Sequence, residues 1–431
     1  MHVSEPVTAT DSTRPVLTLA DVVRQHADEA AMLWVSRARL VAAPRARLFE
    51  LQRADDRLAA HLDGLAVAGD DGWRLCDAAL EDRTAGATFA SAAVAIEFRQ
   101  AQRLEHLFTL TDHNPDARDE LASAFAWVER RYLQGTVAGL LKSAEPSRRL
   151  AGVAACGAHR VDPGLAAGPW LRDEDPLVRA RALRAAGEVG CLPVLGACKS
   201  ALSDADADCQ FWAAWSAVLL GDRGLALNSL VRAGLAAGPR HPCAFALALQ
   251  AMDLGDTHGV LQKLAADPAA IRLLLQGSGI AGDSIYVPWL IGHMANDGLA
   301  RIAGEAFTLI TGADLDALQL TRPRPEAVES EPGESPEDEN VAMDPDEDLP
   351  WPDPGRVRSW WNANAARFPP GVRHFMGAPV GRAKYVDVLK IGYQRQRVLA
   401  ARALCLLDPG TPLFNTSAPA WRQRMLLVQV A

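Results

Sequence analysis

Cysteine pairs with metal-ligand or redox spacing are missing from this sequence. The seven cysteines are an odd number, none forms a Cys-x-x-Cys motif, and most lie in apolar stretches of helical periodicity. Cys191 and Cys198 flank a predicted turn, but no pair of histidines at zinc-site spacing accompanies them. We therefore predict free thiols buried in a reducing compartment, without a disulfide framework.

Catalytic and phosphate-binding motifs are also missing. The sequence contains no Gly-x-Gly-x-x-Gly, no phosphate-binding loop, no His-Glu-x-x-His and no Gly-x-Ser-x-Gly. His61 and Asp63 are two positions apart, so they point to different sides of a helix. His106 and His113 could share one face, but Asp112-His113-Asn114 is better explained as a helix-capping turn. We predict no catalytic residue, no cofactor and no metal.

Long apolar runs are absent. No stretch approaches the length of a membrane-spanning helix. The polar residues 1–14 lack the apolar core of a secretory signal and are predicted to be a disordered tail. The expected protein is soluble and cytoplasmic.

Basic charge is not concentrated in any stripe, and the net negative charge of the chain comes from one segment. Residues 321–355 contain twelve acidic residues, two arginines and eight prolines, a balance of −10 against a formal net charge of −9 for the whole chain. The remaining residues are therefore close to neutral, and we expect no nucleic-acid partner. This composition predicts a disordered, self-repelling linker over 321–355. An acidic segment that docks on a partner is the alternative.

Alanine and leucine dominate what is present, and aromatic residues make up only 6% of the chain, a balance that favours helices over sheets. At 431 residues the chain is too long for one core. Capped helix starts recur about every 30 residues, which predicts an all-α solenoid of stacked helical hairpins. These starts are Glu145-Pro146, Asp175-Pro176, Asp206-Ala207, His241-Pro242, Asp267-Pro268 and Asp297-Gly298.

The predicted organisation follows from these features. An N-terminal helical region covers 15–130, and the repeat solenoid covers 131–320. Beyond the acidic linker, residues 356–431 form a helical segment that continues or caps the solenoid. Within the clearest repeat, Arg179, Arg181 and Arg184 cannot all face the same way on one helix.

Five tryptophans are the candidate partner-binding residues. Trp212 and Trp215 lie three positions apart on a repeat helix and form either core or an exposed aromatic ridge. Trp351, Trp360 and Trp361 lie beside the predicted linker, where they either anchor its end or bind a partner.

Two resemblances add to these predictions. Asp175–Arg179 and Asp297–Arg301 look like the second-helix pattern of HEAT and PBS-lyase-type HEAT-like repeats. His26–Trp34 and Asp56–Leu65 resemble the N-terminal hallmark of an uncharacterised proteobacterial HEAT-repeat family. Its closing block is similar to two further segments, Leu389–Ala401 and Phe414–Thr416. Members of that family tend to be encoded beside type VI secretion genes, which implies an accessory role in effector loading or spike assembly.

The leading hypothesis is accordingly a non-catalytic scaffold or adaptor that binds a secretion effector or spike component. The first alternative is an enzyme on a HEAT-like scaffold, of the lyase or DNA glycosylase type. A glycosylase would need a basic concave face that contains aromatic and acidic residues. The second alternative is an immunity protein that binds a secreted toxin.

Overall fold

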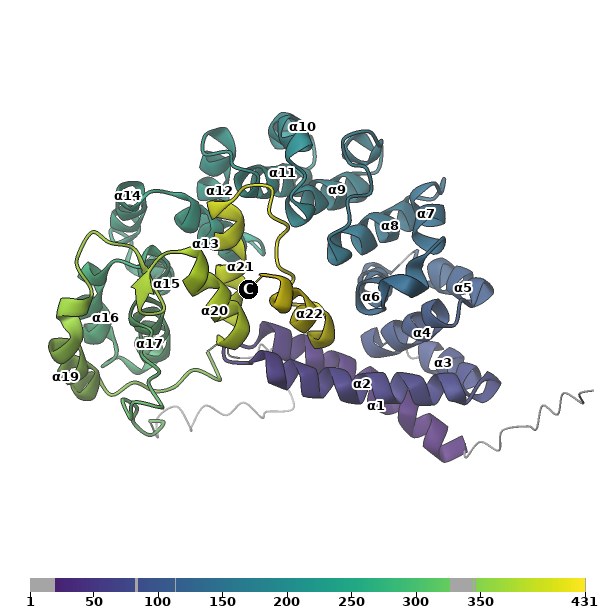
Figure 1. The fold of residues 1–431 in the computed structure, drawn as a ribbon, viewed down its shortest axis with the longest axis horizontal. Coiled ribbons are helices and arrows are strands. Elements are labelled where there is room, and N and C mark those ends of the chain that lie inside the picture. The colour runs from purple at the N-terminus through teal and green to yellow at the C-terminus, as the bar shows by residue number, and fades with distance from the viewer. Residues whose placement is uncertain (1–19, 82–83, 113, 326–343, 345, 431) are drawn as a thin grey trace, which may run out of the picture. The chain divides into compact units, whose positions relative to one another are not determined.

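The computed structural model describes residues 20–81, 84–112, 114–325, 344 and 346–430, and the regular secondary structure of these residues is almost entirely helical (Figure 1). The predicted all-α class is therefore confirmed. The predicted tail over 1–14 lies outside the described residues. No helix in the described ranges is both long enough and apolar enough to cross a membrane.

The first helices are α1 Ala20–Ala42, α2 Leu48–Val67, α3 Asp70–Glu81, α4 Ala85–Glu97, α5 Ala101–Thr111 and α6 Pro115–Trp127. The middle of the chain forms α7 Thr136–Leu141, α8 Pro146–His159, α9 Pro176–Val189, α10 Leu195–Ser200, α11 Ala207–Leu219, α12 Leu225–Leu235, α13 His241–Ala251, α14 Leu254–Leu264, α15 Ile271–Ala281, α16 Val287–His293 and α17 Asp297–Thr311. The last elements are α19 Pro354–Asn364, β1 His374–Phe375, β2 Ala378–Pro379, α20 Arg382–Ile391, α21 Gln394–Leu407 and α22 Ala420–Val430.

Short 3-10 helices separate several of these elements. They are η1 Arg130–Leu133, η2 Trp170–Arg172, η3 Leu192–Val194, η4 Ala201–Ser203, η5 Pro268–Ala270, η6 Ser284–Tyr286 and η7 Ala365–Arg367. Strands β1 and β2 pair antiparallel, with Phe375 opposite Ala378. Both residues of the turn between them, Met376 and Gly377, have positive φ, which suits a tight hairpin.

The chain divides into two compact units. Unit 1 comprises Met1–Val35 and Asp56–Ala124, and unit 2 comprises Ser36–Asp55 and Phe125–Ala431. These limits pass through α1, α2 and α6, so they differ from the predicted boundary at residue 130.

The core of unit 1 forms around α4, whose small residues allow close packing. A Cβ added to Gly86 would lie only 2.2 Å from the carbonyl oxygen of Ala31. The Trp34 ring stacks parallel on Phe89, with 3.6 Å between ring centroids. The Nε1 of Trp34 also donates to Glu120 Oε2 at 2.5 Å, so the indole is fixed on both its apolar and its polar side.

In unit 2, helices close in sequence pack on one another. Helix α8 packs on α9, α9 on α11, α11 on α12, α12 on α13, α13 on α15 and α15 on α17. Alanines at the contacts, such as Ala182, Ala185 and Ala213, are fully buried. Small side chains at these positions let the helix axes approach closely.

A repeated ion pair joins successive helices of this row. Arg149, on α8, binds Asp173 in the loop before α9 through Nε at 2.7 Å and Nη2 at 2.8 Å. Arg179, on α9, binds Asp204 in the loop before α11 through the same two atoms at 3.1 and 3.0 Å. In both copies the aspartate also accepts a hydrogen bond from the backbone N–H two residues later. The contact recurs at the spacing predicted for the repeats.

The C-terminal segment lies along the row of helices. In Figure 1, α20, α21 and α22 lie on the inner side of the arc that α8 to α17 follow. Helix α21 packs against α11 and α13, and β1 packs against α17. That residues 356–431 continue or cap a solenoid stays a prediction. The apolar pattern of α21 shows that the helix is buried, but it cannot show which neighbour covers it.

Part of the predicted linker is also folded. Residues 326–343 and 345 lie outside the described residues. By contrast, Asp346 is buried and binds Arg272 Nη2 at 2.6 Å, and Asp344 binds Arg301 Nη2 at 2.6 Å. The linker prediction over 321–355 is therefore too long, because arginines far away in the sequence neutralise the last acidic residues.

Candidate partner-binding site

Helix α9 begins where the sequence predicts. Asp175 Oδ1 accepts hydrogen bonds from the backbone N–H groups of Leu177 and Val178 at 2.8 and 3.3 Å, which satisfies two of the donors left open at a helix start. Gly190, at φ +72°, ends the helix. Between these limits, spacings of three and four residues place Arg181, Arg184 and Glu188 on one face.

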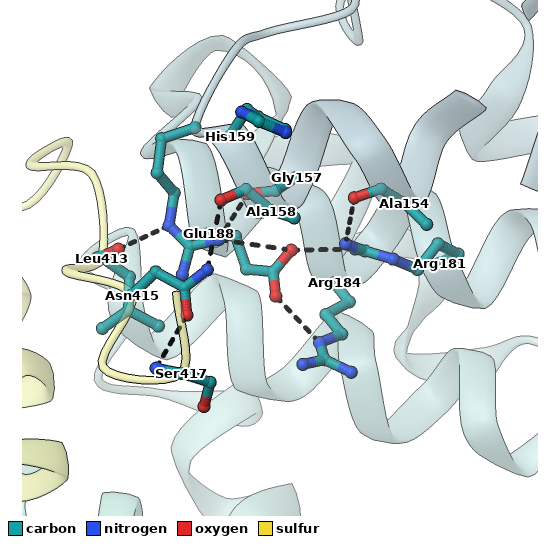
Figure 2. Close-up of polar contacts among 12 residues, drawn as sticks. Ala154, Gly157, Ala158, His159, Arg181, Arg184, Glu188, Leu413, Asn415 and Ser417 are labelled. Carbon is teal, nitrogen blue, oxygen red and sulfur yellow. Dashed lines mark hydrogen bonds and ion pairs between the residues drawn. The ribbon is translucent and has the colours of Figure 1, made fainter. Parts of the chain in front are cut away.

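Glu188 is the centre of a buried charged cluster (Figure 2). Its Oε2 lies 2.9 Å from Arg181 Nη1 and 3.8 Å from Arg160 Nη1. Its Oε1 accepts a hydrogen bond from Arg184 Nε at 3.0 Å. Three guanidinium groups thus share one carboxylate, and we call these four residues the Glu188 cluster.

The cluster carries more positive than negative charge. Burial alone would raise the pKa of Glu188, but Arg181, Arg184 and Arg160 lower it to about 2. Burial lowers the pKa of Arg160 and of Arg181, yet a guanidinium stays protonated at neutral pH because its ordinary pKa exceeds 12. Two positive charges therefore remain without a negative partner inside the cluster.

The Glu188 cluster also anchors the C-terminal segment. Arg160 Nε donates to the carbonyl oxygen of Leu413 at 2.5 Å, and the Leu413 N–H donates to the carbonyl oxygen of Glu188 at 3.0 Å. Asn415 Nδ2 donates to the carbonyl oxygen of Ala158 at 3.2 Å. Figure 2 shows Leu413, Asn415 and Ser417 on the opposite side of Glu188 from Arg181.

Arg184 links the buried cluster to an exposed aromatic side chain. Its guanidinium carbon lies 4.6 Å from the ring centroid of Trp212, and that of Arg240 lies 4.8 Å from the same ring. Arg240 Nε donates to Asp208 Oδ1 at 2.7 Å. The side chains of Arg184, Arg240 and Asp208 are 46%, 38% and 50% exposed, and Trp212 is half-buried. These four residues form what we call the Trp212 surface.

Trp215 does not reach this surface. It is buried, and its ring packs edge-on against Trp212 with 5.4 Å between centroids. The idea of an aromatic ridge formed by both residues is therefore corrected: Trp212 is partly exposed, and Trp215 supports it from below. The three-residue spacing predicts that the rings of Trp212 and Trp215 lie close together. Which of the two rings is buried depends on the packing of α9 on α11.

The other three candidate tryptophans lie elsewhere in unit 2. Trp351 is half-buried, with the guanidinium carbons of Arg301 and Arg322 at 4.8 and 5.7 Å from its ring centroid. Trp360 and Trp361 are half-buried against Phe368, with centroid distances of 6.5 and 5.7 Å. These residues anchor the chain after the acidic segment, which is one of the two roles that their position predicts.

Sequence reasoning missed Glu188, Arg240 and Asp208. Glu188 could have been found from the sequence, because it follows Arg181 by seven residues and Arg184 by four. These spacings place all three side chains on one face of a helix. Arg240 could not have been found, since it follows a loop and reaches Trp212 only through the packing of α11 with α12 and α13. The three arginines of α9 do divide as predicted, because Arg179 binds Asp204 and the other two bind Glu188.

Among the residues that the structure describes, the remaining cysteines and histidines form no cluster that suggests a second site. The seven cysteines are free, and burial raises the pKa of Cys198 to about 12 and that of Cys156 to about 11. In unit 1, His26 Nδ1 and His61 Nδ1 lie 3.0 Å apart in a hydrogen bond. Within the described ranges, no three His, Cys, Asp or Glu side chains could hold a metal ion. His113 lies outside those ranges.

The chain matches no protein-family model and no curated protein with which it was compared. The Trp212 surface and the Glu188 cluster are therefore the structural basis from which a binding role is inferred.

Proposed function

We propose that this protein is a non-catalytic scaffold or adaptor that binds a protein partner through the Trp212 surface. The observation that carries the proposal is a partly exposed tryptophan whose ring is contacted by two arginines, one of which is itself fixed by a buried carboxylate. Tryptophan and arginine are the residues most enriched at the centres of protein interfaces. Side chains that are already held in place lose little entropy when a partner binds.

The arrangement of helices supports the same proposal. The Arg149–Asp173 and Arg179–Asp204 pairs recur at equivalent positions, as expected for stacked HEAT-like repeats. Stacked repeats form extended surfaces suited to binding proteins. The resemblance to a family encoded beside type VI secretion genes suggests that the partner is a cytoplasmic effector or spike component. An immunity protein against a secreted toxin would use the same kind of surface.

A pull-down tests the proposal. The tagged wild-type chain and Trp212→Ala are expressed in the source organism while type VI secretion is active, and captured proteins are identified by mass spectrometry. We expect an effector or spike component with the wild type and at least a tenfold smaller yield with Trp212→Ala. Phe98→Ala is the matched control, since Phe98 is an exposed aromatic residue of unit 1.

Equal yields from the wild type and Trp212→Ala would contradict binding through this surface. Capture of no secretion component would contradict the accessory role, and capture of a toxin instead would favour the immunity alternative.

A further inference from the structure

We propose that the Trp212 surface recognises an acidic stretch of its protein partner, through carboxylates that bind Arg184 and Arg240. This inference rests on the proposed function, because it names the chemistry of the partner at the same surface. Three observations support the inference: the net positive charge of the Glu188 cluster, the free terminal nitrogens of Arg184 and Arg240, and the contacts of these two arginines with the Trp212 ring.

The charge balance favours an anionic partner. Glu188 is the single carboxylate shared by Arg160, Arg181 and Arg184, and it lies below the surface. The side chains of the first two arginines are only 13% and 15% exposed, whereas Arg184 is 46% exposed. The uncompensated positive charge of the cluster therefore reaches solvent mainly through Arg184.

The terminal nitrogens of both exposed arginines are available. Arg184 uses Nε to bind Glu188, and Arg240 uses Nε to bind Asp208. In the part of the chain that the structure describes, neither residue forms a hydrogen bond through Nη1 or Nη2. Two guanidinium groups with free ends thus lie on Trp212, and each can bind a carboxylate.

Fixation by Nε also favours tight binding. Arg184 is held by Glu188 and by the Trp212 ring before any partner arrives. Ordering a long side chain on binding costs roughly 0.5–1.5 kcal/mol, and that cost is reduced here.

A nucleic acid would be a poorer fit to this surface. Arg184 and Arg240 already lie over the Trp212 ring, and Phe211 and Trp215 pack edge-on near it at 4.9 and 5.4 Å, so that these groups compete with a base for the ring. The distinction between the two ligand classes is part of the test.

Fluorescence anisotropy with the full-length protein tests the inference. The probes are fluorescein-labelled hexaglutamate, hexaglutamine and a short single-stranded DNA. We expect hexaglutamate to bind at least tenfold more tightly than hexaglutamine and more tightly than the DNA, with an affinity that falls as salt rises. The double variant Arg184→Gln/Arg240→Gln should lose at least tenfold in affinity for hexaglutamate.

A charge-matched control separates this surface from general attraction. Arg24→Gln/Arg74→Gln removes the same charge from exposed positions of unit 1 and should bind within twofold of the wild type. Arg240→Gln alone leaves the Glu188 cluster intact and should still lose threefold or more, which keeps the test valid if the double variant misfolds. Equal binding of hexaglutamate and hexaglutamine, tighter binding of DNA, or equal losses in both double variants would overturn the inference.

The outcome is distinguishable from that of the proposed function. If Trp212→Ala loses the native partner while Arg184→Gln/Arg240→Gln keeps it, the adaptor role stands and the acidic partner is wrong. If hexaglutamate binds as expected but no native partner is captured, the chemistry of the surface stands and the adaptor role is wrong.

Discussion

Glu188 is a single residue with two separate structural roles. Its carboxylate neutralises part of the charge on Arg160, Arg181 and Arg184, and its carbonyl oxygen accepts a hydrogen bond from Leu413. Removing one member of such a buried charged group typically destabilises a protein strongly, because the other charges remain buried without a partner. The residue is therefore structural, and it acts on the Trp212 surface only by holding Arg184.

His159 gives a prediction about pH at the same scale. Burial, together with the charge of Arg422, lowers its pKa to about 4. Its Nε2 lies 2.9 Å from the carbonyl oxygen of Phe125, and its Nδ1 is buried without a hydrogen-bond partner. The imidazole is thus neutral in the folded protein, while in the unfolded chain it binds a proton near pH 6.5.

The folded protein loses stability as the pH falls, because the unfolded chain takes up a proton at His159 before the folded protein does. Stability from neutral His159 is complete above pH 6.5 and is lost as the pH falls toward 4. His159→Gln removes this titration and keeps an amide donor. Between pH 7 and pH 4.5, we expect the wild type to lose roughly 2–3 kcal/mol more unfolding free energy than the variant. Urea unfolding at both pH values measures the difference, and equal losses would contradict the assignment.

At the scale of the element, substitutions at two helical glycines of unit 2 separate the effect of helix packing on stability from that of helix propensity. Gly279 lies in α15 against α17, where an added Cβ would be 2.7 Å from the Ala306 Cα. Gly292 lies in α16 with nothing within 4 Å of the position of an added Cβ. Gly277, in α15 like Gly279, is also in close approach, since an added Cβ would lie 2.6 Å from Leu261 Cδ2.

Alanine substitutions should therefore have opposite effects. Gly279→Ala should cost about 1–3 kcal/mol, because α15 and α17 must move apart. Gly292→Ala should leave the unfolding free energy unchanged or raise it by up to about 1 kcal/mol, since alanine favours the helix. Urea midpoints of the two variants check this pair, and a loss of equal size in both would show that packing at Gly279 is not the cause.

The elements themselves could largely be predicted from the sequence. Local signals such as Asp175-Pro176, with Gly190 as the end, mark α9 because capping depends only on neighbouring residues. Which helices and side chains contact one another across the fold could not be predicted. Arg272 meets Asp346 and Arg240 meets Trp212 through packing between segments far apart in the chain. Trp212 was a candidate from its residue type, whereas its partial exposure follows from that packing.

At the scale of the whole molecule, the C-terminal segment is part of the fold of unit 2. Arg422 donates to the carbonyl oxygens of Ala126, Trp127 and Val128 at 2.8, 3.0 and 3.0 Å. Contacts of this kind to main-chain acceptors leave buried carbonyl groups unsatisfied when the donor is removed, and each such group costs roughly 1–3 kcal/mol.

A chain that ends at Leu407 tests this role. It lacks Leu413, Asn415 and Arg422, so we expect a clearly lower urea midpoint and stronger binding of a hydrophobic dye than in the wild type. The urea midpoint of Arg422→Gln should lie between those of the shortened chain and the wild type, since this variant removes only the donors of one side chain. An unchanged midpoint in the shortened chain would show that α8 to α17 are stable without this segment.

The link between Arg160 and Leu413 also has a consequence for synthesis. The two residues are 253 positions apart, and at about 5–20 residues per second a ribosome needs roughly 10–50 s to cover that distance. During this interval α8 and α9 have emerged, while the carbonyl group that accepts from Arg160 has not been made. The nascent chain therefore carries an incomplete Glu188 cluster until Leu413 has been made and has left the ribosome.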